Sequence, residues 1–204
     1  MSLRYGINGI GNEKMEASQQ LKHIENVRQL LSDLGEQPER DGLLKTPGRF
    51  ISSMNDLCSG YQADIDKLIN GALFDVTYDD MVIVRNIEFY SLCEHHMIPF
   101  YGRCHVGYIP DKKVIGLSKI PRIVNAFSKR LQVQERLTAQ ISESLQTHLK
   151  PQGVGVVMEA WHLCMMMRGV EKQSSFTISS SMQGCFRNID TREEFMAHVR
   201  SGTP

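Results

Sequence analysis

The sequence has no excess of either charge sign and no long hydrophobic run. Lys and Arg number 23, and Asp and Glu also number 23, so the formal net charge is zero. A neutral chain lacks the bulk electrostatic attraction that holds proteins on nucleic acid or on anionic lipid. No stretch of about 18 apolar residues is present, and no apolar segment follows the early Arg4. We therefore expect a soluble, cytoplasmic protein that binds neither nucleic acid nor membranes.

The sequence also lacks a disulfide framework. Its five cysteines are scattered and odd in number, whereas a small secreted protein has an even, closely spaced set. We expect free thiols in a reducing compartment, some of which bind metal. The 204 residues are 41% hydrophobic and 23% charged, as in an ordinary globular protein, and they suit one domain with an appended segment.

Hydrophobic spacing divides the chain into a helical first third and a mixed remainder. We expect a flexible arm at 1–12, a helical region at 13–75 and a main domain at 76–204. The order of elements predicts an α+β fold with a mostly antiparallel sheet. The predicted helices are 13–34, 46–60, 64–69, 118–130, 132–149 and 191–200, and the predicted strands are 81–92, 101–109, 114–117, 154–164 and 174–182.

Two Cys–His pairs could bind a metal ion. Cys93 and His96 follow the end of a predicted strand, and their thiolate and imidazole donors suit zinc. His162 and Cys164 lie late in another predicted strand, where alternation places them on the same face. Together the pairs supply either four ligands or three ligands and a spare histidine. A site with one open position would hold an activated water, whereas buried thiols beside surface histidines would be purely structural.

Cationic and polar side chains near these pairs predict an anion site. Ser118, Lys119 and Arg122 open a predicted helix, and Arg168 follows the second Cys–His pair. Backbone N–H groups at a helix start and nearby cations suit a phosphorylated substrate, although single Lys or Arg residues there are usually solvated. In the pair Gln134-Glu135, the amide and carboxylate have the hydrogen-bonding groups that could recognise guanine, although most such pairs on a helix surface have no such role.

At these residues the chain resembles a known family, GTP cyclohydrolase I. The likeness is carried by three long segments, SLCEHHMIPFYGRCHVGYIP, GLSKIPRIVNAFSKRLQVQERLTAQI and HLCMMMRGVEKQSSFTISSSMQGCF. The early GLLKTPGRF and the late TREEF resemble the same family, so the likeness covers roughly residues 25–200. Ser179 stands where the family usually has Thr, and the hydroxyl is kept.

The resemblance implies a role for individual residues. Cys58, Cys104, Cys185 and His105 match no functional position of the family, and we expect them to be structural. The matching positions are, for zinc, Cys93, His96 and Cys164; for catalysis, His95 and His162; for guanine, Gln134 and Glu135; for ribose and triphosphate, Ser118, Lys119, Arg122 and Arg168, with Arg49 as a further phosphate contact.

The resemblance also implies a reaction and an assembly. The reaction is zinc-dependent hydrolytic opening of the guanine imidazole ring of GTP, which releases formate and forms 7,8-dihydroneopterin triphosphate, the first step of folate and pterin biosynthesis. The implied fold is the tunnelling fold, an antiparallel sheet with helices packed on one side, so that 76–204 would be the catalytic domain. Sheets of several subunits would join into a barrel, and two stacked pentamers would form a decamer. Regulation, and the choice among folate, tetrahydrobiopterin and deazaguanine products, stay open.

Two other functions are compatible with parts of the sequence. Nitrile reductases of the queuosine pathway share the tunnelling fold but use a catalytic Cys and a nicotinamide cofactor, and the two Cys–His pairs favour zinc hydrolysis instead. A non-catalytic, zinc-stabilised nucleotide-binding module would be favoured if His95 completed a closed site of four ligands.

Overall fold

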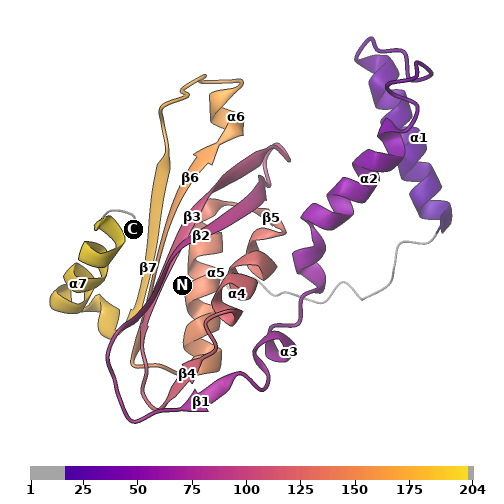
Figure 1. The fold of residues 1–204 in the computed structure, drawn as a ribbon. Helices are drawn as coiled ribbons and strands as arrows, with labels where there is room; N and C mark the ends of the chain where they lie inside the picture. Colours follow the sequence, from indigo (N-terminus) through magenta and orange to yellow (C-terminus); the bar gives the residue numbers. More distant parts are fainter. Residues whose placement is uncertain (1–16, 202–204) are drawn as a thin grey trace, which may run out of the picture. The chain divides into compact units, whose positions relative to one another are not determined.

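The computed structural model describes residues 17–201, and the chain divides into two compact units, Met1–Asp56 and Leu57–Pro204 (Figure 1). The arm predicted at 1–12 lies outside the described residues, and the predicted boundary after residue 75 stays a prediction. No helix in the described part of the chain is long and apolar enough to span a membrane.

The first unit is helical, as the hydrophobic spacing predicts. Helix α1 spans Ala17–Asp33 and α2 spans Thr46–Leu57, the last residue of which belongs to the second unit. The chain leaves α1 through Gly35, whose φ of +89° is a conformation that favours glycine. Helix α2 begins at Thr46, the predicted start.

The second unit is built on a curled sheet of five strands in the order β5-β2-β3-β6-β7. Every neighbouring pair is antiparallel except β2–β5, which is parallel and two residues long. The α+β class and the mostly antiparallel sheet are therefore confirmed. The strands of this sheet are β2 Val82–Cys93, β3 Pro99–Ile109, β5 Leu131–Gln132, β6 Gly153–His162 and β7 Thr177–Gly184, and a separate pair is β1 Leu73–Asp75 with β4 Lys113–Ile115.

Two long helices cover one face of the five-stranded sheet. Helix α4 (Lys119–Ser128) and helix α5 (Gln134–Leu149) bury one hydrophobic stripe each against it. Alternate residues of β3 and β6 supply the facing side chains, as the two-residue period of a strand requires. The fully buried residues of this core include Ile120, Ile123, Leu137, Ile141, Leu145, Val106, Val154 and Val156.

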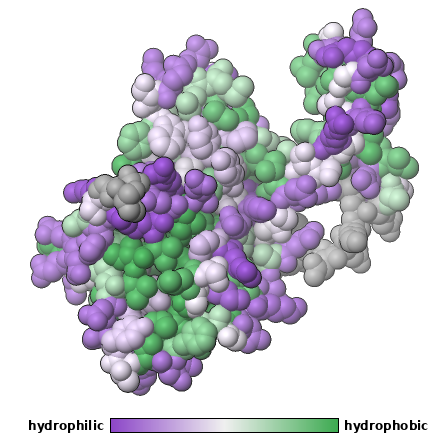
Figure 2. All heavy atoms as spheres, in the orientation of Figure 1, coloured by the Kyte–Doolittle hydropathy of each residue, from purple (hydrophilic) through white to green (hydrophobic). Residues whose placement is uncertain are grey.

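The opposite face carries the last helix, so the expectation of helices on one side only was wrong. Helix α7 (Ile189–Arg200) places Phe195 against Phe186, and both rings pack with Val157. Glycines of β3 and β6 make room for these rings, because a Cβ at Gly155 would lie 2.4 Å from Phe186. Figure 2 shows hydrophobic side chains gathered on the sheet face beside α7.

The boundaries of two elements differ from the prediction. The strand predicted at 154–164 stops at His162, because the chain turns into the short helix α6 (Leu163–Met166). A capping box predicted a helix start at Thr191, but α7 begins at Ile189, after the extended residue Asn188. The remaining short helices are η1 Ser59–Gln62, α3 Ile65–Ile69 and η2 Cys185–Arg187.

Candidate metal centre and active site

A tight loop after β2 brings His96 back over Cys93. The N–H of Cys93 donates to the carbonyl of Ile98 at 2.9 Å, and the N–H of Met97 donates to the carbonyl of Cys93 at 2.8 Å. Met97 has a φ of +54°, a left-handed conformation that closes the turn. As a result, the Cys93 Sγ lies 3.8 Å from the His96 Nδ1.

Cys164 completes a group of three possible metal ligands. Donor atoms of Cys93, His96 and Cys164 all lie within 4.8 Å of one another. The sequence placed His162 and Cys164 on one face of a strand, and that premise was wrong, because Cys164 lies in α6. The helical turn after β6 nevertheless brings the Cys164 thiol beside the end of β2.

The three side chains fit a zinc ion. Zn–S bonds of about 2.3 Å and Zn–N bonds of about 2.0–2.1 Å place tetrahedral ligands roughly 3.4–3.8 Å apart. The 3.8 Å separation of Cys93 Sγ and His96 Nδ1 agrees with such an edge. Burial and the neighbouring Cys93 sulfur raise the pKa of the Cys164 thiol, so a cation would be needed to hold both sulfurs as thiolates.

His95 is exposed at the rim of this group. Its Nδ1 lies 3.6 Å from the Cys93 Sγ, but His95 is not part of the set whose donor atoms are all mutually close. Among the described residues, three side chains therefore converge and no fourth closes the site. An open ligand position is the arrangement of catalytic zinc sites.

His162 lies at the end of β6, and two side chains contact its imidazole ring, one on the flat face and one at the edge. Its ring stacks on Phe100 of β3, with centroids 4.7 Å apart and planes 3° from parallel. Its Nε2 lies 2.8 Å from the Oε1 of Gln134, at the start of α5. Burial lowers the pKa of His162, and the charge of Glu135 partly offsets that effect.

Charged side chains surround the same region. Glu94, next to Cys93, forms an ion pair with Arg136 in the first turn of α5, and the Arg136 hydrogen bond lowers the pKa of Glu94. The Nη1 of Arg168, after α6, lies 3.2 Å from the Nε2 of His96. Arg168 is therefore beside the Cys–His group, and Glu135 lies near enough to His162 for its charge to raise the pKa of that ring. Neither Phe100 nor the Glu94–Arg136 pair belongs to a motif that would have selected it from the sequence.

The first residues of α4 are not brought to this group. Residues 131 and 132, just after α4, pair with Leu92 and Cys93, so the C-terminal end of α4 is the end near the Cys–His group. Ten residues of helix extend about 15 Å, which places Lys119 and Ser118 at the remote end. Arg122 lies one turn into the helix and is exposed. Arg49 lies on α2, in the first unit, and its predicted phosphate contact stays a prediction.

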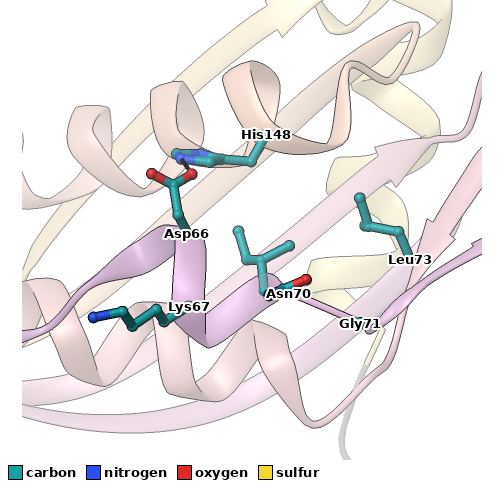
Figure 3. A pocket seen from close by; sticks show the side chains of 7 residues that line it. Asp66, Lys67, Asn70, Gly71, Leu73 and His148 are labelled. Carbon is teal, nitrogen blue, oxygen red and sulfur yellow. Dashed lines mark ion pairs between the residues drawn. The ribbon is translucent and has the colours of Figure 1, made fainter.

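Two surface hollows lie away from the Cys–His group. The larger, of about 430 Å³, lies beside α3 and the C-terminal end of α5, where Asp66 pairs with His148 at 3.2 Å (Figure 3). It contains none of the predicted site residues. A hollow of about 240 Å³ beside η1 is lined in part by Arg122 and Lys129.

Known proteins match this chain over most of its length. The family model described as GTP cyclohydrolase I matches residues 23–200. The GTP cyclohydrolase 1 of Leptospira biflexa is 57% identical over 87% of this chain and 97% of its own length. The enzyme of the same name from Porphyromonas gingivalis is 53% identical, over 90% of this chain and 94% of its own.

One further relative and one solved structure also match. The GTP cyclohydrolase 1 of Dictyostelium discoideum is 51% identical over 86% of this chain and 76% of its own length. The apo archaeosine synthase QueF-Like structure covers 53% of this chain and 97% of its own, with a TM-score of 0.45 and 16% identity, and supports no conclusion. The family match spans the whole Cys–His group, and the chain belongs to the GTP cyclohydrolase I family.

Proposed function

We propose that this protein is a zinc-dependent enzyme that opens the imidazole ring of GTP by hydrolysis. The products are formate and 7,8-dihydroneopterin triphosphate. The observation that supports this proposal best is the open group of Cys93, His96 and Cys164, with His162 held beside it. Bound there, zinc would activate a water for attack at C8 of the purine. The free cysteines suit a reducing compartment, so we place the reaction in the cytoplasm.

Each neighbouring side chain has a role in this proposal. His162 passes a proton from the attacking water to N7 of the purine when the ring opens. His95, exposed at the rim, assists opening of the ribose ring. Glu135 accepts hydrogen bonds from the guanine edge, and Arg168 carries positive charge toward the triphosphate.

Ser118, Lys119 and Arg122 would act on the triphosphate of a neighbouring subunit's site. Because α4 runs away from Cys93, these residues and the Cys–His group of one chain lie at opposite ends of that helix. At a subunit junction, Lys119 of one chain could instead lie beside the Cys–His group of its neighbour, so both would belong to one active site. We therefore propose the tunnelling-fold assembly, in which sheets join into a barrel and two pentamers stack into a decamer. Edge strand β7, whose strand neighbour in the described sheet is β6, offers an edge for such joining.

The reaction can be tested directly on the purified protein. With zinc present, GTP should yield formate and the fluorescent pterin in equal amounts. Prior treatment with a chelator should abolish both products, and added zinc should restore them, because the water would lose the cation that lowers its pKa. Formate without pterin would contradict the proposed second half of the reaction, and neither product would contradict the whole assignment.

The shared site can be tested by mixing two inactive variants. In the proposed junction, one subunit supplies Lys119 and its neighbour supplies His162. A site in a 1:1 co-assembled mixture of Lys119→Ala and His162→Ala is intact only when each subunit carries the other's substitution, which random assembly gives for about one quarter of the sites. We expect each variant alone to be nearly inactive and the mixture to regain about a quarter of the wild-type rate. A mixture that gains nothing would contradict a junction site and favour one built within a single chain.

A further inference from the structure

We propose that Gln134 is a positioning residue for His162 and does not use its side chain to bind guanine. The inference rests on the catalytic role proposed above for His162. Gln134 is the first residue of α5, and the residue is only 1% exposed. An amide buried to this extent, in contact with the chain on all its polar atoms, has no free group to offer a substrate.

The hydrogen bonds of Gln134 determine which way its amide faces. Its Nε2 donates to the carbonyl of Met158 on β6 at 3.1 Å and to the carbonyl of Thr177 on β7 at 3.0 Å. Backbone carbonyls can only accept, so the nitrogen must be the atom that faces them. The amide oxygen therefore faces His162, whose Nε2 lies 2.8 Å away.

This orientation fixes the tautomer of His162. An amide oxygen can only accept, so the Nε2 of His162 must carry a hydrogen in this contact. The stacked ring of Phe100 prevents the imidazole from tilting out of that plane. Nδ1 is then the nitrogen left to exchange a proton with a substrate, and no group in the described part of the chain hydrogen-bonds it.

A polar seam between α5 and β7 holds Gln134 in place. We define the seam as Gln134, Thr138 and Ser142 of α5 with the facing residues of β7. Thr138 Oγ1 lies 2.7 Å from the Oγ of Ser179, and Ser142 Oγ lies 2.6 Å from the Oγ of Ser181. Four residues of a helix rise about 6 Å and two residues of a strand rise about 6.7 Å. Every fourth residue of α5 can therefore lie opposite every second residue of β7. Gln134 is the end of this seam that reaches the active site.

The kinetic test compares two seam variants. Gln134→Leu removes the acceptor of His162, whereas Ser142→Ala removes a buried seam hydrogen bond two turns away from it. We expect Gln134→Leu to lower kcat about 10–100-fold with KM for GTP changed less than about threefold, the size of loss typical of orienting partners. Ser142→Ala should keep the wild-type kcat. A raised KM at unchanged kcat would overturn the proposal, because it is the result expected of a guanine contact.

Neutron crystallography of the wild-type protein tests the same inference without any substitution. We expect a deuterium on Nε2 of His162, directed at Oε1 of Gln134, and two on Nε2 of Gln134, directed at the carbonyls. A His162 Nε2 without deuterium would overturn the proposal even if Gln134→Leu failed to fold. The His162→Ala variant tests the catalytic role of His162 separately from its orientation by Gln134. Wild-type turnover in this variant would contradict the catalytic role, whereas the neutron structure would still show whether Gln134 orients the ring.

Discussion

Replacement of Cys164 by serine is expected to abolish zinc binding and to lower kcat/KM for GTP on the order of 1,000-fold. Cys164 supplies one of three donors that lie within 4.8 Å of one another, and a serine hydroxyl is a poor replacement for a thiolate. Without the metal, the pKa of the attacking water returns from about 7 to its far higher value in bulk water, so little hydroxide is available at neutral pH. Zinc content and steady-state turnover of the purified variant measure both effects.

Cys58→Ser is the matched control for this substitution. Cys58 is a half-buried thiol outside the group of converging donors, so its replacement should leave zinc content and turnover unchanged. The stability of Cys164→Ser distinguishes a catalytic from a structural metal. Cys164 is the most exposed member of the main core, which lies mostly under α4 and α5, and serine is nearly isosteric with cysteine, so we expect the variant to unfold within about 1 kcal/mol of wild type. Global unfolding on loss of zinc would instead favour the non-catalytic, zinc-stabilised module.

Long elements of this fold were predictable because their own side chains carry the pattern. The four-residue spacing of Leu137, Ile141, Leu145 and Leu149 predicted a helix at 132–149, and all four side chains are buried in α5. The short strands β1 and β5 were missed, because two or three residues form a strand only when a partner is in place. Their pairing depends on the positions of β4 and β2, so the amino-acid pattern within β1 and β5 does not predict it.

The Cys–His group was predictable from its residue types, but the arrangement around His162 was not. The two Cys–His pairs were recognisable from residue type alone, which does not depend on the predicted secondary structure. Cys164 therefore lies in the group although it belongs to α6 and not, as predicted, to a strand. The stacking of Phe100 on His162 depends on the register of β3 and β6, in which these two residues are partners. The hydrogen bond between His162 and Gln134 depends in addition on how α5 docks, whereas the adjacent amide and carboxylate and the family resemblance led us to expect a guanine contact for Gln134.

That register gives Gly102 a large predicted effect. Gly102 of β3 pairs with Ala160 of β6. This pair is two residues along the strands from the pair of Phe100 with His162, and therefore on the same face of the sheet. A Cβ at Gly102 would lie 1.8 Å from the carbonyl oxygen of Glu159 and 2.8 Å from the Cα of Ala160. Both are backbone atoms, so the strands themselves would have to separate. The Phe100–His162 stack would be displaced with them.

We therefore expect Gly102→Ala to lower the free energy of unfolding by about 3 kcal/mol and kcat on the order of 100-fold. Gly116→Ala is the control, because its Cβ would meet its nearest neighbour at 3.8 Å, an ordinary contact, and should change stability by less than about 1 kcal/mol. Denaturant unfolding and GTP turnover measure the two quantities on each variant. Wild-type stability and turnover in Gly102→Ala would show that β3 and β6 can part here without cost, and that the close approach of these strands does not hold His162 in position.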